Sequence, residues 1–123
     1  MVNIGIIGAG RIGKVHAASI TNHVQGARVF AVADPFMTEA TVTWAAGLGI
    51  EKAYEDYRKI LSDETIQAVL VCSSTDTHAD IAIEAIRAGK HVFCEKPVSQ
   101  DLGKIREVMD ALEGSACKFQ VGF

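Results

Sequence analysis

The sequence is poor in several features that would assign it to a special class of protein. Its 123 residues include two Pro, one Trp and three Cys. Cys72, Cys94 and Cys117 are odd in number and lack a CxxC spacing, which argues against a disulfide framework or a structural zinc site. No run approaches the ~18 apolar residues of a membrane span, and the N-terminus lacks the pattern of a signal peptide. We therefore expect a cytoplasmic protein without a metal site or a membrane partner.

Composition and charge narrow the class further. Hydrophobic residues make up 49% and charged residues 22% of the chain, a balance that excludes intrinsic disorder. The net charge is −3 and no basic run is present, so we expect no nucleic-acid partner. Domains commonly have about 100–150 residues, and residues 1–123 are therefore expected to form a single domain.

Short β-rich runs alternate with helical patterns along the whole chain. Such alternation requires crossover connections and favours a parallel sheet with helices on both faces. Six strands in this rhythm predict a doubly wound α/β (Rossmann) domain with strand order 3-2-1-4-5-6. The predicted strands are 3–7, 28–33, 52–54, 67–72, 90–94 and 117–121. The predicted helices are 11–23, a helix that Thr38 caps, with Glu39 in its first turn, and that stops near Gly47 and Gly49, then 56–62, 77–88 and 101–113.

Apolar residues recur at helical spacing in three of these helices and predict their buried faces. In 11–23 the face contains Ile12, Val15, His16, Ser19 and Ile20; in 77–88 it contains Ile81, Ala82, Ala85 and Ile86; in 101–113 it contains Leu102, Ile105, Val108, Met109 and Leu112.

A GxGxxG sequence, Gly8-Ala9-Gly10-Arg11-Ile12-Gly13, follows the first predicted strand and opens the first helix. This context is typical of a dinucleotide-binding turn. Gly8 allows the tight turn, Gly10 leaves room for a pyrophosphate, and Gly13 lets the helix approach the sheet. The helix N-terminus, beginning at Arg11 and Ile12, offers backbone N–H groups to the anion. The alternative is a structural turn without a ligand.

An acidic residue ends the second predicted strand. Asp34 stands 21 residues after Gly13 (34 − 13), where dinucleotide sites place the carboxylate that binds the adenosine ribose hydroxyls. A carboxylate repels a 2′-phosphate, and Pro35 follows instead of an Arg, so NAD is favoured over NADP. Asp34 could also cap a turn before Pro35, and the two roles are compatible.

Hydroxyl residues follow the fourth predicted strand. Ser73, Ser74 and Thr75 can face the pyrophosphate and nicotinamide ribose of a dinucleotide, or Ser74 or Thr75 can cap the next helix. The sequence leaves both roles open. His78 lies in the first turn of that helix, where a lone His is more often a structural hydrogen-bonding residue than a catalyst. His16 has no recognisable partner spacing and is interpreted as structural or surface.

Glu95-Lys96-Pro97 closes the fifth predicted strand at the same edge of the sheet. A Lys in a partly dry pocket can exchange a proton with a substrate hydroxyl. Taken alone, the segment is better explained as a solvated loop lysine.

Four motifs together, GAGRIG at 8–13, ADP at 33–35, SSTDTH at 73–78 and CEKP at 94–97, resemble those of the Gfo/Idh/MocA oxidoreductase family. The resemblance implies an NAD-binding domain that serves the oxidation of a ring hydroxyl of inositol or another polyol. It also implies a catalytic Lys96 that contacts the reacting hydroxyl, followed by a cis Pro97. The expected cofactor-binding residues are Gly8, Gly10, Arg11, Ile12, Gly13, Asp34, Ser73, Ser74, Thr75, His78, Glu95, Lys96 and Pro97.

The family also carries a second domain that binds substrate and builds the oligomer, and we expect that domain to be absent here. The 123 residues would then bind NAD(H) without being catalytically competent, and a polyol or sugar would bind only with the missing domain. Alternatives are a free-standing NAD(H)-binding module or redox sensor, an engineered domain, or adenosylmethionine-dependent transfer, which the EKP segment disfavours.

Self-association is expected at an exposed interdomain face near Phe119, Val121 and Phe123 or at the edge strand 117–121. Alternatively, four residues could be surface substitutions that favour another assembly: Phe30, Phe36, Thr41 and Thr43.

Overall fold

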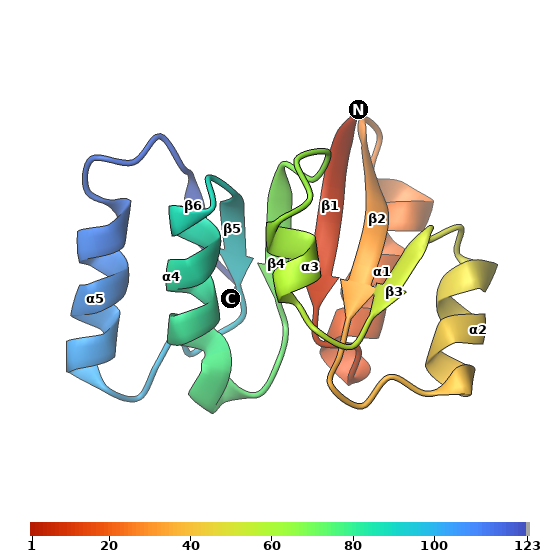
Figure 1. Cartoon of the computed structure of the whole chain (residues 1–123), viewed down its shortest axis with the longest axis horizontal. Helices are drawn as coiled ribbons and strands as arrows, with labels where there is room; N and C mark the ends of the chain where they lie inside the picture. Colours follow the sequence, from red (N-terminus) through yellow and green to blue (C-terminus); the bar gives the residue numbers. More distant parts are fainter. Residues whose placement is uncertain (123) are drawn as a thin grey trace.

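The computed structural model describes residues 1–122 and shows a six-stranded parallel sheet with helices on both faces (Figure 1). The strand order is β3-β2-β1-β4-β5-β6, which confirms the predicted doubly wound topology. The elements are β1 (Val2–Ile7), α1 (Arg11–His23), β2 (Ala27–Ala33), α2 (Glu39–Gly47), β3 (Lys52–Tyr54), α3 (Arg58–Leu61), β4 (Ala68–Val71), the 3₁₀ turn η1 (Thr75–Thr77), α4 (His78–Arg87), β5 (His91–Cys94), α5 (Leu102–Leu112) and β6 (Phe119–Val121).

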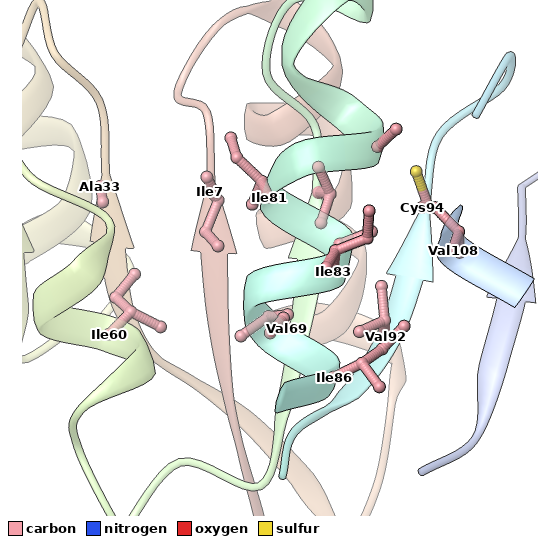
Figure 2. Close-up of a cluster of buried hydrophobic side chains, with 14 of the residues drawn as sticks. Ile7, Ala33, Ile60, Val69, Ile81, Ile83, Ile86, Val92, Cys94 and Val108 are labelled. Carbon is pink, nitrogen blue, oxygen red and sulfur yellow. The ribbon is translucent and has the colours of Figure 1, made fainter. Parts of the chain in front are cut away.

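Alternate side chains of the central strands fill two separate cores. Ile7 points to the face covered by α3, α4 and α5, and its neighbour Ile6 points to the face covered by α1 and α2. This follows from the two-residue period of a strand and explains why β1 and β4 are almost wholly apolar. Figure 2 shows the first of these cores, in which α4 contributes Ile81, Ile83 and Ile86. The predicted inward residues of this helix are confirmed as buried.

The predicted face of α1 is correct at Ile20, which packs against the core, but wrong at Ile12 and Val15. Ile12 and Val15 are 42% and 51% exposed, whereas Gly13 and Ala17 are the buried residues of the helix. A Cβ at Gly13 would lie 2.0 Å from the carbonyl oxygen of Gly8, so the helix packs too close to β1 for a larger side chain. Helical spacing alone does not reveal that the contact requires small residues.

The predicted face of α5 is also only partly correct. Val108 is buried, but Leu102 and Met109 are 82% and 64% exposed. The helix packs beside α4 at one end of the molecule, so a narrow strip of its surface is covered (Figure 1). The apolar residues outside that strip face solvent within the described chain.

Several element boundaries and two surface assignments also differ from the predictions. A 3₁₀ turn precedes α4, and the last strand begins at Phe119 instead of residue 117. Thr41 is buried and Phe30 is partly buried, so they are not surface positions, whereas Phe36 is 83% exposed. Phe123 lies outside the described residues.

Candidate functional site

The site is built from the loops that leave the carboxyl ends of four strands. β1 lies between β2 and β4, and the chain leaves these strands toward opposite faces of the sheet. Such a topological switch point is where open parallel sheets bind ligands. A cleft of about 1130 Å³ opens there, larger than the roughly 300–1,000 Å³ typical of small-molecule pockets. Its lining includes seven predicted site residues, Gly8, Gly10, Arg11, Ile12, Asp34, Ser73 and Ser74.

The three motif glycines of the turn before α1 meet different surroundings. Gly8 has φ +103°, and a Cβ there would lie 2.6 Å from the backbone of Cys72 and Ser73. Gly13 must lack a side chain, because a Cβ there would collide with the carbonyl oxygen of Gly8. At Gly10, by contrast, a Cβ would have no protein atom within 4 Å. Gly8 and Gly13 are therefore required by the fold, whereas Gly10 keeps space open in the cleft.

The N-terminus of α1 is free to receive an anion. Its N-cap is Gly10, which makes no side-chain capping hydrogen bond, and its first turn contains no acidic residue. The first N–H groups of a helix have no partner within the helix and carry partial positive charge. The turn therefore presents donors to the cleft at the point where Gly10 leaves room.

Asp34 connects the end of β2 to this turn. Its Oδ2 accepts a hydrogen bond from the backbone N–H of Ala9 at 2.8 Å, and its Oδ1 accepts one from the N–H of Phe36 at 2.8 Å. The second contact is the turn cap that the sequence left open, and the first fixes the carboxylate against the glycine turn. A carboxylate offers about four acceptor positions, so both oxygens can accept further hydrogen bonds.

The hydroxyl residues after β4 line the cleft more than they cap the helix. Ser73 Oγ lies 2.8 Å from Thr77 Oγ1, and Thr77 Oγ1 donates to the carbonyl of Ser74 at 2.7 Å. Ser74 is the N-cap of η1 but makes no side-chain capping hydrogen bond. Ser73, Ser74 and Thr77 line the cleft, and Thr75 is not among its lining residues. The predicted side-chain cap is therefore not formed.

His78 and the EKP segment lie beside the cleft instead of lining it. His78 is 2% exposed, with Nδ1 2.9 Å from the carbonyl of Pro97 and Nε2 2.8 Å from that of Ser73. The Lys96–Pro97 peptide bond is cis, as the resemblance implies, and Lys96 is exposed. Glu95 is held by His16, whose Nε2 lies 2.5 Å from Glu95 Oε1. Sequence reasoning missed this pair because its members are 79 residues apart.

The cleft also has a wall that the motifs did not predict. Ile12, Val15 and Phe36 expose apolar surface on it, and Tyr57 and Arg58 enter from α3. Burial, and then the hydrogen bond from its hydroxyl to Glu84, raise the pKa of Tyr57 to about 12. In the sequence, Phe36 directly after Pro35 was the one indication of an apolar wall.

The described residues contain neither a helix that could span a membrane nor a cluster that could hold a metal ion. Among residues 1–122 no helix is both long and apolar enough to cross a membrane. The same residues contain no group of three or more His, Cys, Asp or Glu side chains arranged to hold a metal ion.

Comparison with known proteins agrees with this geometry. The model of the GFO_IDH_MocA oxidoreductase family, described as an NAD-binding Rossmann fold, matches residues 2–123. The myo-inositol 2-dehydrogenase of Thermotoga maritima is 37% identical over 122 residues, and the inositol 2-dehydrogenase of Rhizobium meliloti is 41% identical over 122 residues. Each alignment covers 99% of this chain but 36% of the relative, so the chain spans little more than a third of their length.

Solved structures show the same similarity. The apo scyllo-inositol dehydrogenase of Lactobacillus casei has a TM-score of 0.91 and 35% identity, over 99% of this chain and 36% of that one. The structure of that enzyme with bound NAD(H) and scyllo-inositol gives the same TM-score of 0.91. The chain therefore belongs to the Gfo/Idh/MocA oxidoreductase family and has the NAD-binding Rossmann fold of that family.

Proposed function

We propose that this chain is the cofactor-binding part of an NAD-dependent dehydrogenase that oxidises a ring hydroxyl of inositol or a similar polyol. The observation that carries the cofactor half of this proposal is the open space at Gly10, in front of an uncapped helix N-terminus. The substrate class is supported by the names of relatives that are 37% and 41% identical.

The residues present fit a dinucleotide. The free N–H groups at the start of α1 would hold the pyrophosphate, and the space at Gly10 would admit it. Asp34, fixed by two backbone N–H groups, would accept hydrogen bonds from the adenosine ribose hydroxyls. The same carboxylate would repel a 2′-phosphate, which favours NAD over NADP. Ile12 and Phe36 would offer exposed apolar surface to the adenine.

Lys96 is our candidate for the residue that meets the reacting hydroxyl. When bound, NAD supplies the hydride acceptor. Lys96 follows β5 at the carboxyl edge of the sheet and is exposed, and among residues 1–122 its ammonium forms no ion pair. Its three N–H groups are therefore free to hold a substrate oxygen or exchange a proton with it.

We infer that the 123 residues alone bind NAD(H) and oxidise a polyol slowly or not at all. Among the described residues, the His side chains nearest this edge, His16 and His78, are both engaged with protein groups. Neither is free to act as a general base beside Lys96. Inositol-dependent formation of NADH by this chain at the rate of a full-length relative would refute the inference.

An NAD⁺ titration by calorimetry tests the cofactor proposal. We expect Asp34→Ala to weaken NAD⁺ binding at least about tenfold, since a hydrogen bond to a charged group contributes about 1.5–3 kcal/mol. The same variant should narrow the preference for NAD⁺ over NADP⁺. Asp110→Ala, at an exposed position of α5, is the matched control. Equal NAD⁺ affinity in Asp34→Ala and the control would contradict the placement of the ribose.

Self-association at the edge strand remains a proposal. Among residues 1–122, β6 (Phe119–Val121) pairs with β5 alone, so its other edge presents backbone groups that no described strand pairs. We expect dimers or larger species at high concentration in light scattering, and a monomer under those conditions would count against this edge as an interface.

A further inference from the structure

Two histidines from different helices hold the Glu95-Lys96-Pro97 segment from its two ends. His16, on α1, contacts the side chain of Glu95, and His78, at the start of α4, contacts the carbonyl of Pro97. Lys96 stands between these two anchored residues and is itself exposed. The segment is thus fixed on either side of Lys96, the candidate for contact with the reacting hydroxyl.

The contact with His16 is part of a packed arrangement. The His16 ring meets Phe93 edge to face, with 5.4 Å between ring centroids. His16 and Glu95 side chains are 26% and 19% exposed, so water competes little for the contact. A Cβ at Gly122 would lie 2.8 Å from Phe93 and 3.3 Å from Glu95 Oε1, which closes the other side. The Glu95 carboxylate therefore has little freedom to move.

The contact with His78 links the segment to the loop after β4. The buried ring lies between the carbonyl oxygens of Ser73 and Pro97, one beside each ring nitrogen, and a neutral imidazole donates a hydrogen bond to one of the two. Ser73 lines the cleft, so this ring connects the cleft wall to the residue after Lys96. On the other side, His16 stands within one turn of Gly13, so α1 connects the glycine turn to the residue before Lys96.

We propose that His16 and His78 are positioning residues that set Lys96 relative to the cofactor site. This inference rests on the proposed function, since it concerns the lysine of that same site. α1 holds the lysine segment through His16, and His78 at the start of α4 connects that segment to Ser73 in the cleft lining. A dinucleotide held by the cleft would therefore meet Lys96 at a fixed distance, and loss of either histidine would release the lysine without removing the cleft.

The test compares His16→Leu and His78→Leu with the matched control His23→Leu, an exposed residue at the end of α1. Lysines are labelled by reductive ¹³C-methylation, and the Lys96 signal is assigned with Lys96→Arg. NAD⁺ and ADP-ribose are added separately, because only NAD⁺ carries the nicotinamide. Amide exchange at Glu95 and Lys96 is measured without ligand.

In the wild type and in His23→Leu we expect NAD⁺, but not ADP-ribose, to shift the Lys96 signal. In His16→Leu and His78→Leu this shift should be lost and the two amides should exchange faster. The ADP-ribose affinity of His16→Leu should stay within about twofold, because the His16 contacts with Glu95 and Phe93 lie outside the cleft lining. His16→Gln retains an N–H donor for Glu95 and should restore the shift. Unchanged exchange and an unchanged shift in the Leu variants would overturn the proposal.

The buried His78→Leu could lower stability, so its melting temperature is measured and His78→Gln, which keeps one donor, is the second variant. His16 is only half-buried, so His16→Leu tests the proposal independently of any loss of stability in His78→Leu. If the wild type bound neither ligand, the proposed function would fail, and the ligand-free exchange at Glu95 and Lys96 would still decide whether the histidines hold the segment.

Discussion

Replacing Gly10 by Ala should separate folding from ligand binding at the glycine turn. Gly10 has φ −78° and ψ −165°, an extended conformation that Ala adopts without strain, and its Cβ would meet no protein atom within 4 Å. A Gly→Ala change at such a position stabilises a protein by about 0.4–1 kcal/mol through the unfolded chain. We therefore expect the melting temperature of Gly10→Ala to stay level or rise by roughly 1–5 °C.

Ligand binding should respond in the opposite direction. The added methyl group would occupy the space that the pyrophosphate needs and would move the phosphate oxygens away from the N–H groups of α1. Losing one charge-assisted hydrogen bond costs about 1.5–3 kcal/mol, which corresponds to at least about a tenfold rise in the Kd for NAD⁺. Calorimetric titration and thermal unfolding of the same preparation measure both effects.

Two other glycines provide the controls. Gly47→Ala, at the end of α2, also adds a methyl group to open space and should leave the NAD⁺ affinity unchanged. Gly8→Ala combines φ +103° with a Cβ only 2.6 Å from the backbone of Cys72 and should lower stability by about 1–3 kcal/mol. The reasoning is refuted if Gly10→Ala binds NAD⁺ as tightly as Gly47→Ala, or if it unfolds as readily as Gly8→Ala.

Three further predictions concern the cysteine thiols, Lys90 and Tyr57. Burial raises the pKa of the Cys72 and Cys94 thiols to about 12, so at pH 8 a thiol reagent should modify Cys117 alone until denaturant is added; rapid reaction of all three would contradict the packing. Lys90 is buried, desolvation lowers its pKa, and its Nζ donates to two carbonyl oxygens at 2.6 and 2.7 Å. Lys90→Met, which orphans both carbonyls, should lower the free energy of unfolding in urea by about 2 kcal/mol, and no change would show them to be solvated. The pKa of Tyr57 is about 12 in the folded chain and about 10 when unfolded, so the protonated phenol stabilises the fold below pH 10 and this contribution is lost as pH rises through 12. The stability difference between wild type and Tyr57→Phe should shrink over that range, and a constant difference would count against the part-buried hydrogen bond to Glu84.

The parts of the fold that depend on local sequence were predicted well. The N-cap Thr38 accepts a hydrogen bond from the N–H of Thr41 and α2 begins at the next residue, as the cap pattern indicated. The strand at 52–54 and the six-strand order were also predicted. These features are set by residues close in sequence and by the handedness of crossover connections, which one chain is sufficient to show.

The buried faces of α1 and α5 were predicted less well, for two different reasons. The sheet-facing side of α1 consists of Gly13 and Ala17 because the helix lies against the carbonyl of Gly8. Hydrophobic spacing overlooks such small residues and favours Ile12 and Val15, which instead expose apolar surface to the cleft. α5 lies at the end of the molecule, where Met109 is left uncovered among the described residues.

The sequence by itself determined the motifs and the sheet edge where they gather. GxGxxG, Asp34, the hydroxyl residues and Lys96 each follow a strand, and a parallel sheet brings the ends of its strands together. Only the tertiary structure decided which groups meet there. It separated Gly10, which keeps space for a ligand, from Gly8 and Gly13, which the packing requires. It also paired His16 with Glu95 across 79 positions. Such contacts depend on how closely helices pack against the sheet, which is set by all the side chains between them and not by any local pattern.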